Sequence, residues 1–68
     1  MRLYDNDEET INEWSRILMA KYGTYFRRYG NNNETLNIWS KRLAKEYGKP
    51  FYLKPSVHET LVSWANLI

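Results

Sequence analysis

The sequence predicts an all-α fold, a compact bundle of three helices, and two observations lead to that prediction. The first is an internal repeat of 25 residues: segments 6–30 and 31–55 share 10 of 25 residues without a gap, and segment 56–68 is a truncated third copy. The second is that every copy has the same helix-start signal followed by the same apolar spacing. Because repeats of this length usually contain one supersecondary unit each, we expect one helix per copy.

Each predicted helix begins at a polar residue that is followed three positions later by glutamate. This is the spacing of a capping box, in which the polar side chain accepts a hydrogen bond from the third helical amide and the glutamate can reach back. Gly23 and Gly48 stand where a left-handed glycine commonly ends a helix. These signals predict helices over 7–22, 32–47 and 57–67. The three cap pairs are Asn6 with Glu9, Asn31 with Glu34, and Ser56 with Glu59.

Apolar residues recur along each predicted helix at the three- and four-residue intervals that place side chains on one face. Ile17 and Met19 widen the first stripe, so we expect the first helix to be the most buried. A tryptophan at such a spacing is usually a core residue. The stripes are Ile11, Trp14, Leu18 and Tyr22; Leu36, Trp39, Leu43 and Tyr47; and Val57, Leu61, Trp64 and Ile68.

The two linkers, 24–30 and 49–55, are rich in aromatic residues. They could lie extended against the bundle or pair as two short strands, although two strands alone are marginally stable. The third copy ends in the apolar pair Leu67 and Ile68. We expect this pair to pack back on the bundle or to meet a second copy of the chain, which would make a homo-oligomer.

Length and composition restrict the function. A chain of 68 residues predicts one domain, 1–68, and with no cysteine and one histidine it predicts neither a disulfide nor a metal site. It contains no phosphate-cradling glycine loop and no nucleophile–base constellation, so we expect neither an enzyme nor a cofactor. No apolar run is long enough for a membrane span, and the acidic N-terminus does not resemble a secretory signal. We therefore expect a cytoplasmic protein without membrane contact.

The charge distribution indicates a binding surface. Residues 16–54 contain nine Lys and Arg against two Glu, whereas residues 1–15 contain one Arg against five Asp and Glu. Seven of the eight Tyr and Phe residues lie within 22–29 or 47–52. Because cations bind phosphates and aromatic rings stack on bases, this pattern favours nucleic-acid binding. The candidate contact residues are Arg27, Arg28, Lys41, Lys45, Lys49, Tyr25, Tyr29, Tyr52 and Ile38.

Two other interpretations of the same residues remain open. Ile38 lies opposite the apolar stripe of its helix, between Lys41 and Lys45, where it could contact a partner. An adaptor or inhibitor that docks on an acidic protein would use the same aromatic and cationic residue types. In the purely structural interpretation, cations near helix ends complement the helix dipole and the tyrosines fill a small core.

Overall fold

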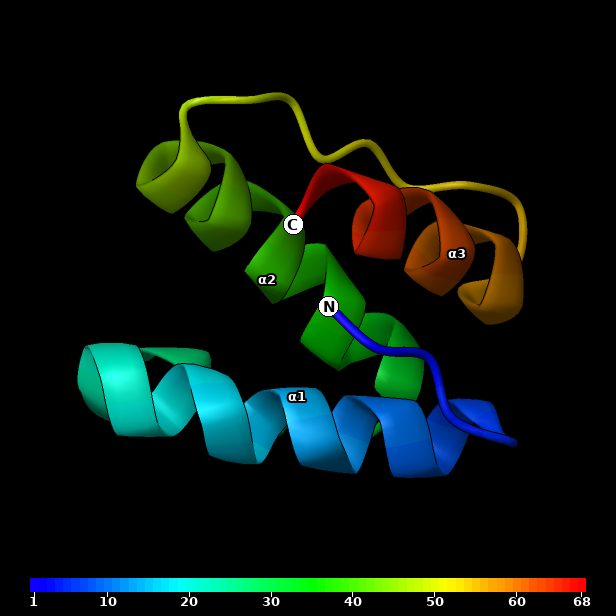
Figure 1. Cartoon of the computed structure of the whole chain (residues 1–68), viewed down its shortest axis with the longest axis horizontal. Helices are drawn as coiled ribbons and strands as arrows, with labels where there is room; N and C mark the ends of the chain where they lie inside the picture. Colours follow the sequence, from blue (N-terminus) through cyan, green and yellow to red (C-terminus); the bar gives the residue numbers. More distant parts are fainter.

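The computed structural model describes all residues 1–68 and consists of three helices without any strand (Figure 1). They are α1 (Asp7–Tyr22), α2 (Asn32–Tyr47) and α3 (Val57–Leu67), with a short 3-10 helix, η1 (Gly23–Phe26), after α1. The predicted helix bounds are confirmed. The alternative in which the linkers pair as strands is wrong, because their backbone groups bond to tryptophan and threonine side chains instead of to each other.

Side-chain caps begin all three helices, as the sequence predicts. Asn6 accepts from the Glu9 amide at 2.7 Å, and the Asn31 and Ser56 side chains accept equivalent bonds at 2.8 and 3.1 Å. The glutamate side chains do not accept hydrogen bonds from the backbone amides of the cap residues, which is the second contact of a capping box. The Glu34 carboxylate accepts from the Gly30 amide at 2.9 Å, and the carboxylate of Glu59 accepts from the Ser56 hydroxyl at 3.0 Å.

The two glycines end their helices differently. Gly48 has φ 66° and ψ 24°, the predicted left-handed conformation. Gly23 also has a positive φ of 74°, but its ψ of −164° lies outside the left-handed helical region, so the prediction is wrong there. The chain turns at Gly23 directly into η1, which delivers Phe26 to the core at 0% exposure.

The core is built from the predicted stripes, with Trp14, Trp39 and Trp64 all at 0% exposure. Each indole Nε1 donates to a backbone carbonyl twelve residues earlier in the chain, at 2.8, 3.2 and 3.0 Å, respectively. These bonds fix an extended segment against each helix. Ile17 is 44% exposed, because it projects to the outer side of α1, so it does not widen the buried stripe of that helix.

Three buried threonines add a second recurring contact. Each hydroxyl accepts a hydrogen bond from the backbone amide six residues earlier, at 3.0 Å in every case. It also donates a hydrogen bond to the carbonyl of the residue that caps its helix. The hydroxyl groups therefore satisfy both the extended segment and the first helical turn. These residues are Thr10, Thr35 and Thr60.

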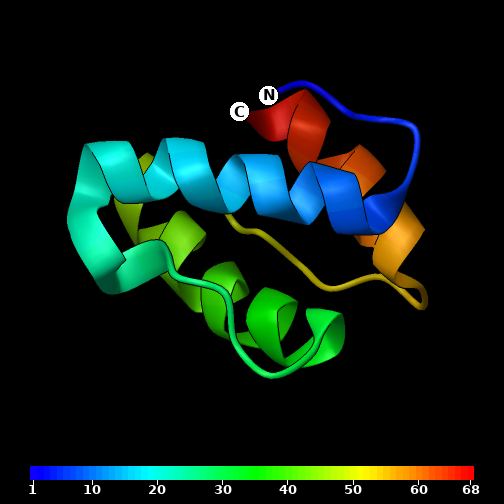
Figure 2. The ribbon, with the colours of Figure 1, turned by 90° about the horizontal axis from the view of Figure 1, so that it is seen from below.

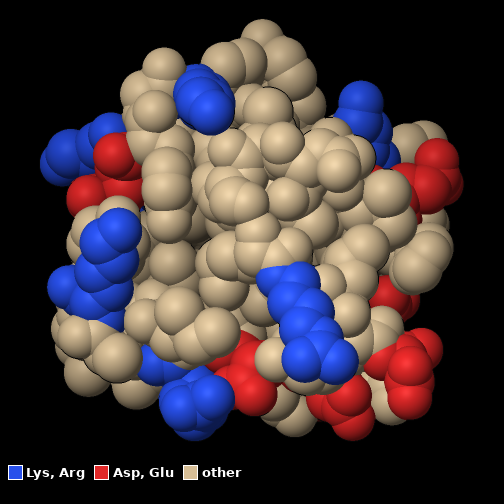
Figure 3. All heavy atoms as spheres, viewed as in Figure 1, with Lys and Arg blue, Asp and Glu red and all other residues tan.

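The two chain ends lie side by side (Figures 1 and 2). The Met1 amino group donates to the carbonyl oxygens of Ala65, at 3.4 Å, and Ile68. Leu67 and Ile68 are half-buried against the core cluster, which agrees with the expectation that they pack back on the bundle. The face around the chain ends is uncharged above its centre and crossed by one basic side chain below it, with most Asp and Glu towards one side and most Lys and Arg towards the other (Figure 3).

The Ser56 cap gives a first stability prediction. Ser56→Ala removes the acceptor for the Glu59 amide, and loss of such a cap is expected to lower the free energy of unfolding by about 1 kcal/mol. Thermal melts would measure it, with Leu61→Ala as the reference for a large core loss. An unchanged melt for Ser56→Ala beside a clear shift for Leu61→Ala would remove the energetic role of this cap.

Candidate binding site: a basic and aromatic hollow on α2

The outer side of α2 carries a hollow of about 500 Å³, which we call the α2 hollow. Its α2 residues are spaced three and four positions apart, so they share a face that is turned away from Trp39 and Leu43 in the core. No carboxylate lines it. The lining residues are Tyr25, Asn37, Ile38, Lys41, Arg42 and Lys45.

The structure thus brings four predicted contact residues together: Tyr25, Ile38, Lys41 and Lys45. Arg42 was not among the predicted contact residues, and its guanidinium carbon lies 4.4 Å from the centre of the Tyr25 ring. Its Nη1 donates to the Tyr25 carbonyl, so Arg42 joins η1 to α2. The spacing of Arg42 four residues after Ile38 was the available sequence signal, but its aromatic partner is 17 residues away in the chain.

Tyr29 and Arg27, in the linker after η1, do not line the α2 hollow but lie beside its Arg42. The Arg27 guanidinium carbon lies 4.9 Å from the Tyr29 ring centre, and that of Arg42 lies 5.7 Å from the same centre. Arg42 Nη1 also donates to the Tyr29 hydroxyl at 2.7 Å. A hydrogen bond from Arg27, followed by the bond and positive charge of Arg42, holds the pKa of Tyr29 below its ordinary value, although partial burial acts to raise it.

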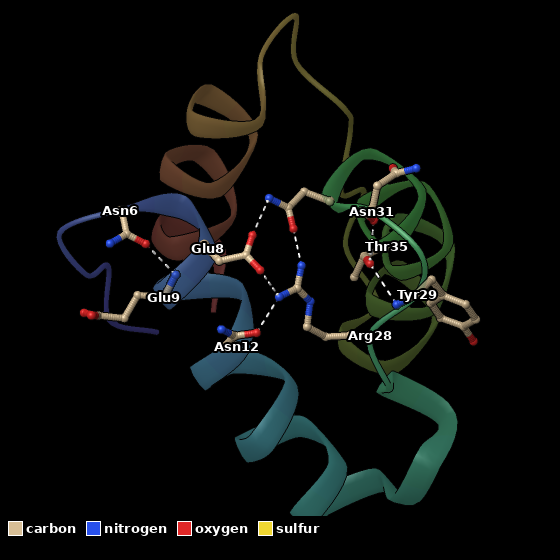
Figure 4. A network of polar contacts seen from close by, with 9 residues as sticks. Asn6, Glu8, Glu9, Asn12, Arg28, Tyr29, Asn31 and Thr35 are labelled. Carbon is tan, nitrogen blue, oxygen red and sulfur yellow. Dashed lines mark hydrogen bonds and ion pairs between the residues drawn. The ribbon is translucent and has the colours of Figure 1, made fainter.

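Arg28 points away from this group and binds between the first turns of α1 and α2 (Figure 4). Its guanidinium donates to Glu8 at 2.5 Å and to the side-chain oxygens of Asn12 and Asn32. Hydrogen bonds from Arg28 and Asn32, together with the Arg28 charge, hold the pKa of Glu8 below its ordinary value. Arg28 is therefore already paired within the protein and is not part of the α2 hollow.

Lys49 and Tyr52 also lie outside the α2 hollow. The Lys49 ammonium donates to the Leu67 carbonyl at 3.2 Å, at the end of α3. Tyr52 is 71% exposed, and its own carbonyl accepts the Trp64 indole bond. By contrast, Tyr22 and Tyr47 are half-buried against the core, as the purely structural interpretation expects of tyrosines in a small domain.

The other two surface hollows lie at matching positions of α1 and α3 but differ in chemistry. Residues 12–13, 37–38 and 62–63, which are 25 positions apart, line one hollow each. The α1 hollow contains Glu8, Glu9 and Glu13 with a single cation, Arg16. The α3 hollow contains two basic residues, Lys54 and His58, beside Glu59. Only the α2 hollow combines three cations with an aromatic ring and no acid.

No protein-family model, curated protein or solved structure matches the chain. None of its three helices is both long enough and apolar enough to cross a membrane. The fold and the α2 hollow define a small three-helix protein with a localised basic and aromatic surface.

Proposed function

We propose that this protein is a non-catalytic binding protein and that the α2 hollow contacts the phosphate backbone of nucleic acid. The observation that carries the proposal is that Lys41, Arg42 and Lys45 line one hollow together with Tyr25 and without a neutralising carboxylate. Such a group of cations attracts phosphates and gains free energy when condensed counterions are released.

The arrangement of the cations on α2 fits a phosphate backbone. Lys41 and Lys45 are four residues apart on one helix, and the rise of 1.5 Å per residue separates them by about 6 Å along the axis. One DNA strand advances about 3.4 Å per nucleotide. Because a strand also winds round the axis of the duplex, its consecutive phosphates lie farther apart than this rise. The two flexible lysine side chains can therefore reach neighbouring phosphates of one strand, with Arg42 between them in the sequence.

One observation favours an acidic protein as a second candidate partner. Ile38 is half-buried in the α2 hollow, where an apolar side chain of a partner could pack while acidic neighbours met the surrounding lysines. Interfaces of this kind commonly combine an apolar centre with a charged rim. This partner would bind by contacts that survive physiological salt better than phosphate contacts do.

We further propose that the chain consists of three copies of one unit, each an extended segment followed by a capped helix. The tryptophan and threonine contacts that recur every 25 residues support this proposal, and they extend the first copy back to Arg2. The first helix contacts the second through Glu8 and Asn32, at 3.1 Å. His58 contacts Asp7 at 3.1 Å. With a repeat of 25 residues, His58 corresponds to Glu8 and Asp7 corresponds to Asn32. The third unit therefore contacts the first unit through the same positions by which the first contacts the second.

Titration of labelled oligonucleotides with the purified protein tests the proposed function. At 150 mM salt we expect fluorescence anisotropy to show binding of single- or double-stranded DNA with a dissociation constant below about 100 μM, the weak end of nonspecific association. Absence of binding at that concentration would contradict the proposal. It would leave the acidic protein partner, which a pull-down with and without nuclease would then identify.

A further inference from the structure

Two arginines lie against Tyr29 without an acidic partner, one at its hydroxyl and one over its ring. Arg42 donates to that hydroxyl at 2.7 Å, and Arg27 lies with its guanidinium carbon 4.9 Å from the centre of the same ring. The ion pairs of the chain involve Arg16, Arg28 and His58, so neither Arg27 nor Arg42 is neutralised by a carboxylate. Two guanidinium groups against one ring, neither of them paired with a carboxylate, are a favourable place for an anion.

The fold holds these three residues in place through their neighbours. The Trp39 indole donates to the Arg27 carbonyl at 3.2 Å, and the Tyr29 amide donates to the Thr35 hydroxyl at 3.0 Å. Arg42 is tied to η1 through the Tyr25 carbonyl. Hydrogen bonds with α2 side chains already fix the backbone of the linker. Little conformational entropy is therefore lost when an anion binds, which favours affinity.

We propose that Arg27, Arg42 and the Tyr29 hydroxyl form a binding site for a single phosphate group at the edge of the α2 hollow. Guanidinium groups bind phosphate through paired, charge-assisted hydrogen bonds, and a tetrahedral phosphate has enough oxygens for two guanidinium groups and a hydroxyl. The inference rests on the proposed function only in taking nucleic acid as the source of the phosphate. In that case Arg27 and Arg42 hold one phosphate of the backbone, and Lys41 and Lys45 contact others.

Inorganic pyrophosphate is the probe that tests this site without nucleic acid. We expect NMR titration of the ¹⁵N-labelled protein at pH 7 to shift the side-chain Nε–Hε signals of Arg27 and Arg42 in a saturable manner. Loss of a charged hydrogen-bond partner should weaken the binding, so Arg42→Gln and Arg27→Gln should each reduce affinity about tenfold or more. Arg27→Gln is the safer variant for folding, because the side chain is exposed. Arg16→Gln, on the outer side of α1, is the matched control and should bind as wild type.

Tyrosine absorbance under alkaline titration gives an independent readout of position. The wild type should show one tyrosine that ionises early, Tyr29, and Tyr29→Phe should lack that step. A phosphate bound beside the hydroxyl disfavours tyrosinate, so pyrophosphate should move the early step to higher pH relative to sodium chloride of equal ionic strength. A purely structural role for the two arginines predicts no such movement.

The outcomes separate this inference from the proposed function. Pyrophosphate binding that depends on Arg27 and Arg42 supports the site even when oligonucleotides fail to bind. Oligonucleotide binding in which Arg27→Gln and Arg42→Gln match the wild type would overturn the site and leave the proposed function standing. Pyrophosphate shifts spread equally over Arg16, Arg27 and Arg42 would also overturn it, because they would indicate only general attraction to positive charge.

Discussion

Trp39→Ala is expected to unfold the protein at ordinary temperature. The side chain is at 0% exposure and packs edge-on against Phe26, with ring centres 6.1 Å apart. Replacing a buried tryptophan by alanine costs about 3–5 kcal/mol, and a core in a chain of this size supplies about the same total. The variant also leaves the Arg27 carbonyl without its indole donor, which adds to the loss.

Urea unfolding followed by circular dichroism measures this effect. Tyr52→Ala is the matched control, because it removes an aromatic side chain that is 71% exposed and should change stability little. A loss below about 1 kcal/mol for Trp39→Ala would be far smaller than burial of an indole requires. Such a result would place Trp39 at the surface and contradict the packing described above.

The affinity for nucleic acid is expected to fall by on the order of a hundredfold between 50 and 200 mM salt. Each neutralised phosphate releases counterions, and the cations of the α2 hollow together with Arg27 offer about three to four such contacts. The four cations concerned are Arg27, Lys41, Arg42 and Lys45. Anisotropy titrations over this salt range give the slope directly. An affinity that stays constant with salt would favour the acidic protein partner and its apolar contact at Ile38.

The helices could be predicted from the sequence because their signals are local. A cap residue and the amide that it binds are three positions apart, and each stripe lies within one helix, so Asn6, Asn31 and Ser56 mark true helix starts. The ψ of Gly23 could not be predicted, because it depends on where Phe26 enters the core.

The candidate site was only partly predictable, because its contacts join distant residues. Lys41 and Lys45 follow from helical spacing, whereas the pairing of Arg42 with Tyr25 requires η1 to fold back over α2. Arg28 has the same residue type and nearly the same position as Arg27. It differs because it forms an ion pair with Glu8, which is 20 residues away in the chain. The sequence indicates on which face of a helix a charged residue lies, but three-dimensional packing decides which cations remain unpaired.

The salt dependence of binding by the Lys41→Ala/Lys45→Ala double variant tests most directly the claim that the α2 hollow is the binding surface. Removing both lysines should flatten the salt slope by about two phosphate contacts without unfolding the bundle, because both side chains are exposed. The matched control is Arg16→Ala/Lys54→Ala, which removes the same charge from the α1 and α3 hollows. Its salt slope should stay close to that of the wild type. If both double variants changed the slope equally, or if the Lys41→Ala/Lys45→Ala variant kept the wild-type slope, nucleic acid would not bind at the α2 hollow.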